Sequence, residues 1–373
     1  MLTLRGIGIA RGNRTSPRAG SARTKPLQNC ARQQRNPSKN PWNSNKTPPE
    51  IGETGPVGWR RWDEAWQEAL YGPGGFYRRA APAEHFATSA QGLGATGALL
   101  AESLLLLAER HGLTRIVEIG AGRGELLTAL AAMSPDTELV GVDIVDRPEP
   151  LPPEVSWIRS PGGAPLPDEL TGLTDTLLVA HEWLDVVPCP VAARGPDGTW
   201  HAVLVAPDGS EQPGPPVAGP DLDWLRGHLP AEVDRAEIGR PRDAAFADLS
   251  ARVRTGLVLV VDYGHLAADR PLHGTLTGYR DGTQAPPVPD GSCDLTAHVA
   301  LDSLGADHVR SQREALHDLL GRAELPSHDL SRTDPTGYLR LLTRANALAT
   351  LTSPTGLGAF WWATSLRSSP DLG

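Results

Sequence analysis

A strand that runs directly into three alternating glycines constrains the fold of this chain more than any other stretch. Residues Arg115–Ile119 are mainly apolar and predict a buried strand. Gly120, Gly122 and Gly124 follow it, and a helix with apolar residues at helical spacing begins after them. A strand, a glycine turn and a helix in this order let the backbone of an α/β sheet approach a nucleotide-like ligand. The sequence therefore predicts an α/β fold with a ligand site at this turn.

The residues around the glycines indicate which class of ligand the turn accepts. A dinucleotide-binding turn needs a further glycine where this chain has Glu125, at the helix N-terminus that would bind a pyrophosphate. Asp143 ends the apolar run Glu138–Asp143, 23 residues after Gly120. At this spacing a carboxylate reaches ribose hydroxyls, although an exposed strand-end cap is the alternative interpretation of Asp143. The pattern argues against a nicotinamide dinucleotide, and so against a dehydrogenase.

Apolar runs alternate with helical patterns over most of the chain, which predicts an α/β fold with a doubly wound, mainly parallel sheet. Further strands are expected at residues 155–158, 176–180, 256–262, 308–311 and 358–364, the last of them an antiparallel C-terminal strand. Helices are expected at 96–111, 314–322 and 335–349, and another from about Thr296 that carries His298. Residues 57–373 are expected to form one domain, with an N-terminal helical part at 59–113 and a hairpin and insertion at 188–255.

The start of the chain differs in charge and residue usage from the rest. Residues 1–50 carry ten Lys and Arg against one Glu, and the remainder carries 25 against 43, so the net charge of −9 divides into +9 and −18. Residues 1–56 are interpreted as a basic arm, an Arg-rich targeting peptide, or an extension translated from a misassigned start. The abrupt change in residue usage favours the last interpretation. Because the segment lacks apolar periodicity, we expect it to be disordered.

Composition argues against several other classes of protein. Cys30, Cys189 and Cys293 lie far apart and the eleven histidines are scattered, so neither a disulfide framework nor a metal site is predicted. No apolar run reaches the roughly 18 residues of a transmembrane helix. The acidic body argues against nucleic acid, which needs a cationic surface. We expect a cytoplasmic protein, or an organelle-targeted one if the basic tail is a transit peptide.

Two strand ends beyond the glycine turn carry the candidate reactive groups, His181, Glu182 and Asp185 on one and Asp262 and Tyr263 on the other. Ligands of open α/β sheets bind beyond the carboxyl ends of the strands, where the strand order reverses. Two carboxylates three residues apart on a turn could hold a planar guanidinium through paired hydrogen bonds. We therefore expect Glu182 and Asp185 at the reaction centre, with Asp262 and Tyr263 lining the substrate pocket. The alternatives are a helix cap for Asp185 and a core position for Tyr263.

Eight motifs together resemble one family. They are Tyr71-Gly-Pro-Gly-Gly-Phe-Tyr77, Phe86-Ala-Thr-Ser89, Glu118-x-Gly-x-Gly-x-Gly124, His181-Glu-Trp-Leu-Asp-x-x-Pro188, Asp262-Tyr-Gly264, Gly274-Thr-Leu-x-Gly-Tyr-Arg280, Asp294-Leu-Thr-Ala-His-Val299 and Gly356-Leu-Gly-x-Phe360. In this order they resemble the MidA-like S-adenosylmethionine (SAM)-dependent methyltransferases, over about residues 59–364. That family includes a mitochondrial protein-arginine methyltransferase of complex I assembly.

The resemblance implies a class I SAM-methyltransferase fold, which is Rossmann-like, and SAM as co-substrate without a metal. The implied cofactor-binding residues are Glu118 at the methionine amino end, Gly120, Gly122 and Gly124 in the loop, Asp143 at the ribose, and Thr88 and Ser89. His181 stands where the family usually has Asn, beside the implied transfer site. The implied activity is methylation of an arginine ω-nitrogen in a protein partner. A SAM-binding assembly protein with little turnover and a small-molecule methyltransferase are the alternatives.

Overall fold

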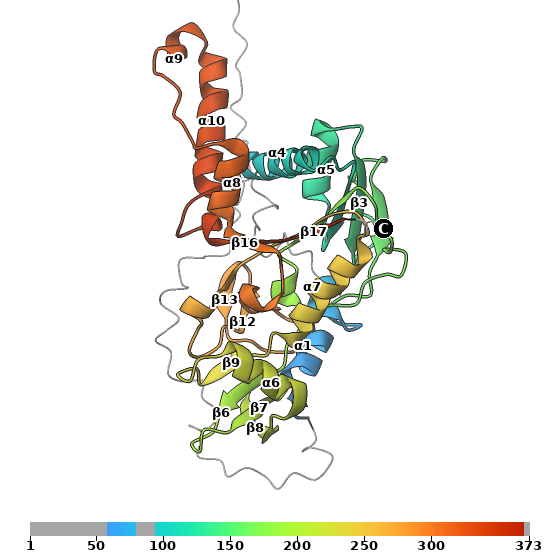
Figure 1. The fold of residues 1–373 in the computed structure, drawn as a ribbon, viewed down its shortest axis with the longest axis vertical. Helices are drawn as coiled ribbons and strands as arrows, with labels where there is room; N and C mark the ends of the chain where they lie inside the picture. The colour runs from blue at the N-terminus through green and yellow to red at the C-terminus, as the bar shows by residue number, and fades with distance from the viewer. Residues whose placement is uncertain (1–57, 80–93, 369–373) are drawn as a thin grey trace, which may run out of the picture.

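The computed structural model describes residues 58–79 and 94–368 of the 373-residue chain (Figure 1). The predictions for residues 1–56, and those for Thr88 and Ser89, lie outside the described residues. Within the described ranges, no helix is both long enough and apolar enough to cross a membrane.

A seven-stranded sheet in the order β16-β17-β10-β5-β2-β3-β4 forms the centre of the fold. Its strands are β2 (Arg115–Ile119), β3 (Glu138–Asp143), β4 (Ser156–Arg159), β5 (Thr176–His181), β10 (Gly256–Asp262), β16 (His308–Ser311) and β17 (Trp361–Arg367). Neighbouring strands are parallel from β10 to β4, whereas β17 runs antiparallel to both β10 and β16. This confirms the predicted doubly wound, mainly parallel sheet with an antiparallel C-terminal strand.

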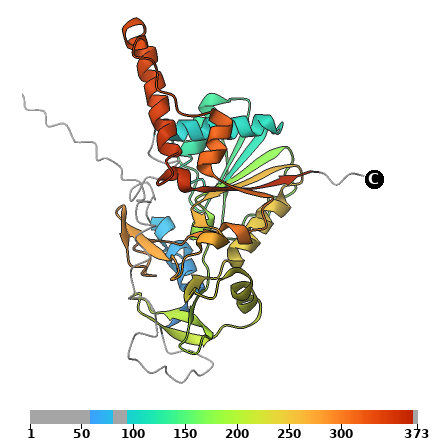
Figure 2. The same ribbon diagram turned by 60° about the vertical axis from the view of Figure 1, so that its left-hand side comes forward.

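Helices cover both faces of this sheet (Figure 2). One face packs against α4 (Ala95–Arg110), α5 (Glu125–Met133), α8 (Gln312–Leu320) and α10 (Pro335–Leu351), and the other against α7 (Arg240–Arg252). Along β5, Leu177 and Val179 join the first cluster while Leu178 and Ala180 join the second. Side chains alternate between faces along a strand, so two covered faces require the continuous apolar run that the sequence shows.

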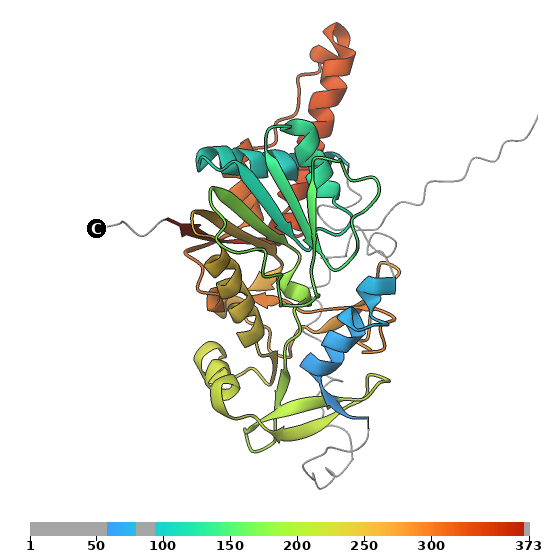
Figure 3. The same ribbon diagram turned by 90° about the vertical axis from the view of Figure 1, so that its right-hand side faces the viewer.

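A second body lies beyond the carboxyl ends of the parallel strands (Figures 1 and 3). Its sheet has the order β1-β7-β6-β9, with β8 beside β7. The elements are β1 (Arg60–Arg61), β6 (Val191–Arg194), β7 (Trp200–Val205), β8 (Glu211–Pro216), β9 (Arg235–Glu237) and α6 (Gly219–His228). Helix α1 (Trp62–Tyr71) buries Trp62 and Trp66 against one face of this sheet, and α6 buries Trp224 against the other. Helix α1 and residues 191–237 of the insertion therefore form one unit next to the strand ends, whereas α4 and α7 pack against the central sheet.

The helix predicted from about Thr296 is wrong. Asp294–Thr296 is a strand, β14, in a small sheet with β12 (Thr277–Arg280) and β13 (Thr283–Ala285). Val299–Ala300 forms β15, which pairs with β11 (Gly264–His265). Along the chain, His298 lies between β14 and β15. Long-range contacts explain the difference, because Trp66 Nε1 donates to the Leu295 carbonyl and Thr296 pairs with Thr277 across the sheet. The remaining short elements are α2 (Phe76–Arg79), α9 (Leu330–Thr333) and the single turns η5 (Leu184–Val186), η6 (Ala267–Asp269), η7 (Leu301–Ser303) and η8 (Leu357–Ala359).

Candidate active site

The glycine turn after β2 has a backbone that only glycine adopts easily. Gly120, Gly122 and Gly124 have φ values of +73°, +59° and +73°, all in the left-handed region. A Cβ atom on Gly124 would also collide with the Leu151 side chain. The turn passes over the end of β3, because the Gly120 N–H donates to the Val142 carbonyl over 2.8 Å. Its glycines therefore fulfil the loop-shaping role that the sequence indicated.

Asp143, at the end of β3, is tied to this turn. Its Oδ2 accepts the Gly122 N–H over 2.8 Å, and its Oδ1 accepts the Val145 N–H over 3.1 Å. Burial raises the pKa of the Asp143 carboxyl, and these main-chain donors oppose that effect. The side chain thus acts as a strand-end cap, and each oxygen retains a second lone pair for a ligand hydroxyl. The ribose role of Asp143 stays a prediction.

Glu118 lies inside β2 and has a buried carboxylate. The residue is only 4% exposed, and its Oε2 has no hydrogen-bond partner among the described residues. Burial raises the pKa of the Glu118 carboxyl well above its usual range, and the charges of Glu125 and Asp143 raise it further. A buried carboxylate beside two others is stabilised by a cation. The amino group and the sulfonium of SAM both supply positive charge, so the orphaned oxygen of Glu118 fits this co-substrate.

The strand ends of β5 and β10 lie next to the glycine turn, since β5 pairs with both β2 and β10. Glu182 follows β5 with a left-handed φ of +52°, a strained backbone for a residue other than glycine. Its N–H donates to the Val261 carbonyl of β10 over 2.8 Å, and its Oε1 lies 3.7 Å from His181 Nδ1. The side chains of His181 and Glu182 are 4% and 5% exposed. The fold thus places these two predicted site residues at the carboxyl edge of the sheet, where ligands of open α/β sheets bind.

Asp185 and Asp262 lie directly behind this edge, both with no exposed surface. Asp262 Oδ2 accepts the Asp185 N–H over 3.1 Å, and its Oδ1 accepts the Tyr263 N–H over 2.9 Å. Burial raises the pKa of the Asp262 carboxyl well above its usual range, and the charges of Asp185 and Glu182 raise it further. The fold therefore concentrates three carboxylates at two adjacent strand ends.

Asp185 lies within the turn η5 and bonds to two hydroxyl groups. Its Oδ2 accepts hydrogen bonds from the Tyr263 hydroxyl and, over 2.6 Å, from Thr296 Oγ1. Burial raises the pKa of the Tyr263 phenol well above its usual range, and the charge of Asp185 adds to the shift. The Tyr263 ring meets Phe360 and His298 edge to face, at centroid distances of 5.7 Å and 5.3 Å. Asp185, Asp262 and Tyr263 thus lie together in a buried cluster, and Tyr263 occupies the core position that was its alternative interpretation. Their roles in the reaction stay predictions.

Sequence reasoning missed several residues of this region. The Tyr71 hydroxyl donates to the Val186 carbonyl over 3.1 Å, and the Tyr77 hydroxyl donates to Asp294 Oδ1 over 2.7 Å. The two aromatics that bracket the Tyr71–Tyr77 turn were the available signal. Arg242, in the insertion, also reaches this region, and no pattern in the sequence indicated that it would. Burial lowers the pKa of His298 to about 4, so its ring is neutral near pH 7.

Comparison with known proteins agrees with this fold. The fold is that of two crystal structures from Burkholderia thailandensis. One, described as 'a COG1565 superfamily member and likely methyl transferase' and bound to S-adenosyl-homocysteine, has a TM-score of 0.67 and 23% identity over 83% of this chain and 88% of that chain. The other, of an uncharacterized protein, has a TM-score of 0.62 and 22% identity over the same shares. These likenesses concern the fold, which is that of the class I SAM-dependent methyltransferases.

The sequence also matches a protein-family model. Residues 145–316, just under half of the chain, match a family model described as 'Putative S-adenosyl-L-methionine-dependent methyltransferase'. No protein with a curated description matches the sequence. Fold and family model agree, and the chain is a SAM-dependent methyltransferase with SAM as co-substrate. Within the described ranges no three His, Cys, Asp or Glu side chains are grouped to hold a metal ion.

Proposed function

We propose that this enzyme methylates a protein side chain, at the ω-nitrogen of an arginine, as its resemblance to the MidA-like methyltransferases implies. The observation that carries the proposal is the group of three carboxylates, Glu182, Asp185 and Asp262, at the adjacent ends of β5 and β10. Three carboxylates close together at one ligand-binding edge favour a cationic ligand. A guanidinium is such a ligand, and its planar donors match a carboxylate in a bidentate pair.

The reaction needs alignment and charge compensation. The acceptor nitrogen attacks the methyl carbon in line with the C–S bond, so that an N–C bond forms, the C–S bond breaks and S-adenosylhomocysteine leaves. The nitrogen then loses a proton. Glu182 is the group we assign to the guanidinium, because it lies at the ligand-binding edge and its strained backbone fixes its direction. Asp185, Asp262 and Tyr263 would support Glu182 from the interior of the protein.

The co-substrate would lie on the other side of the point where the strand order of the sheet reverses. Glu118 is assigned to the amino group of SAM, the glycine turn to close backbone approach, and Asp143 to the ribose. This assignment separates SAM-binding groups on β2 and β3 from acceptor-binding groups on β5 and β10. The two sets meet where β2 and β5 pair.

Charge supports a basic protein segment as partner. After residue 50 the chain carries a net charge of −18, which attracts a cationic substrate and repels nucleic acid. We place the reaction in the cytoplasm, and the free buried thiols of Cys189 and Cys293 fit a reducing compartment.

The proposal is tested by incubating the enzyme with methyl-labelled SAM and a cell lysate, followed by acid hydrolysis of the protein fraction. We expect label in methylated arginine. Label confined to small metabolites would contradict the arginine proposal and establish a small-molecule methyltransferase. Binding of S-adenosylhomocysteine without transfer to any fraction would favour an assembly protein that retains the pocket.

A further inference from the structure

One arginine of the insertion donates hydrogen bonds to both loops that build the transfer site. Arg242, near the start of α7, is 1% exposed. Its Nη2 donates to the Asp185 carbonyl over 2.7 Å and its Nε to the Val187 carbonyl over 3.1 Å. Its Nη1 donates to the carbonyls of Ala297 and His298 over 3.1 Å and 2.8 Å. A single guanidinium thus joins four main-chain oxygens from two segments that are distant in sequence.

These two segments carry the side chains that surround Tyr263. One segment is the turn with Asp185, and the other contains Thr296, whose hydroxyl donates to Asp185. The Ala297 N–H also donates to the Asp185 carbonyl over 3.1 Å. Any shift of the guanidinium would therefore move both partners of the Asp185–Thr296 hydrogen bond.

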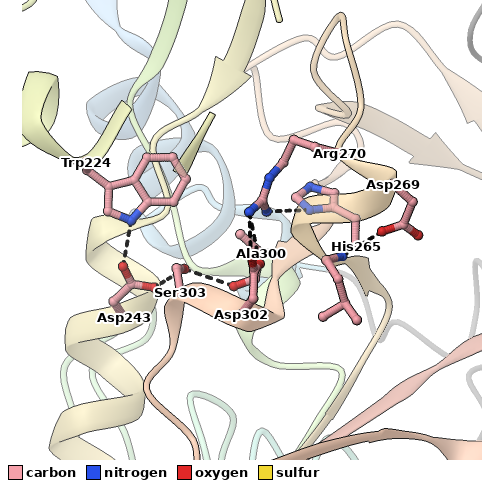
Figure 4. A network of polar contacts seen from close by, with 9 residues as sticks. Trp224, Asp243, His265, Asp269, Arg270, Ala300, Asp302 and Ser303 are labelled. Carbon is pink, nitrogen blue, oxygen red and sulfur yellow. Dashed lines mark hydrogen bonds and ion pairs between the residues drawn. The ribbon is translucent and has the colours of Figure 1, made fainter. Parts of the chain in front are cut away.

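Arg242 is itself held from two sides. Its guanidinium lies over the Trp66 ring of α1, with 5.6 Å from Cζ to the ring centroid. The next residue, Asp243, accepts from Trp224 Nε1 over 2.7 Å and from Ser303 Oγ over 2.6 Å (Figure 4). These bonds fix the start of α7 between α6 and η7. The insertion therefore presents Arg242 to the site from a rigid support.

The geometry points to Arg242 as a positioning residue for methyl transfer. Its fork of donors holds the Asp185 turn and the 297–298 loop at a fixed separation, and through them it aligns the acceptor side of the site. This inference rests on the proposed transfer site at the ends of β5 and β10. It gives the insertion a role in the reaction, since α7 supplies the organising side chain.

The chain offers a matched control on the same helix. Arg252 lies ten residues further along α7, about 15 Å away at the rise of an α-helix. It also donates to main-chain carbonyls, those of Pro167 over 2.6 Å and Leu170 over 3.0 Å. Lysine keeps the positive charge but lacks the planar fork that reaches several acceptors at once. Arg242→Lys and Arg252→Lys therefore remove the same kind of interaction, at the site and away from it.

The experiment compares the full-length wild type with both variants, at a temperature at which each is folded. The measurements are melting temperature, affinity for S-adenosylhomocysteine, and kcat and KM with methyl-labelled SAM. We expect both variants to melt at lower temperature. In Arg242→Lys, kcat should fall roughly 10- to 100-fold, as for a small misplacement of reacting groups, while the KM for SAM and the affinity for S-adenosylhomocysteine change less than about twofold. Arg252→Lys should keep the wild-type kcat.

The outcomes separate this inference from the proposed function. A wild-type kcat in Arg242→Lys, or an equal loss in Arg252→Lys, would overturn the positioning role. If neither Arg242→Lys nor Arg242→Gln folds while Arg252→Lys does, Arg242 serves folding and the inference is also overturned. If the wild type methylates only small molecules, the arginine proposal is contradicted but the role of Arg242 is not. The wild type and the two variants are then compared with the small-molecule acceptor.

Discussion

The Asp143 carboxylate accepts the main-chain N–H of Gly122 over 2.8 Å, and this bond joins the glycine turn after β2 to the end of β3. The two elements that are assigned to SAM are therefore one rigid unit. Because the bond depends on the left-handed backbone of Gly122, we expect the affinity for SAM to depend on the backbone geometry of this turn. Substitutions that change this backbone should weaken SAM binding even where they add little bulk.

Gly122→Ala tests that coupling. An L-residue in the left-handed region costs about 1–2 kcal/mol of stability. We expect the affinity for S-adenosylhomocysteine, measured by calorimetry, to fall roughly 10- to 100-fold, which corresponds to a lost hydrogen bond to a charged group. Gly172→Ala is the matched control, because Gly172 has a φ of +63° and open space around it. An equal loss of affinity in the control would show that the effect is not local.

Glu118→Gln should stabilise the ligand-free enzyme and weaken SAM binding. The pKa of the folded-state carboxyl is raised, chiefly by burial, so the folded chain binds more protons than the unfolded chain above the usual Glu pKa. The contribution of Glu118 to stability is therefore complete below about pH 4 and is lost as the pH rises through the folded pKa. We expect Glu118→Gln to melt higher than the wild type at pH 7 and equally at low pH. A variant that melts lower at pH 7 would contradict this account.

Glu182→Gln should abolish methyl transfer and spare co-substrate binding. The amide keeps the size of the side chain but removes the negative charge that would hold the guanidinium. We expect kcat to fall at least about 100-fold, with the affinity for S-adenosylhomocysteine within about twofold of wild type. Glu149→Gln, at an exposed position before β4, is the control for loss of one negative charge. Parallel loss of affinity in Glu182→Gln would move Glu182 to the SAM side of the site.

Deletion of residues 1–56 should leave the enzyme unchanged. The segment is basic, lacks apolar periodicity and differs in residue usage from the rest. A chain beginning at Val57 is expected to match the full chain in melting temperature and in affinity for S-adenosylhomocysteine. Salt-sensitive binding to polyanions that disappears with the segment would instead identify a functional basic arm.

The sheet could be predicted from the sequence because its signals are local. The apolar runs of β2, β3, β5 and β10 start or end within a residue of the observed strands, and the glycine turn identified the ligand-binding edge. Strand β14 was mistaken for a helix because its conformation depends on Trp66 and Thr277, which are distant in sequence. The role of Arg242 could not be predicted for the same reason, because it also depends on residues that are distant in sequence. A lone arginine in a polar helix predicts a solvated side chain, and only the assembled fold shows the four carbonyls that it reaches.

The position of β17 has a consequence for biosynthesis. This strand separates β10 from β16, and it is the only hydrogen-bonded neighbour of β16 in the described sheet. The nascent chain therefore cannot complete the sheet until residue 367 has left the ribosome. Until then the strongly apolar β10 presents an open edge to other chains, the kind of exposed strand that promotes aggregation during folding. Slow translation after residue 262 would prolong this exposure, and a chaperone that covers apolar edges would shorten it.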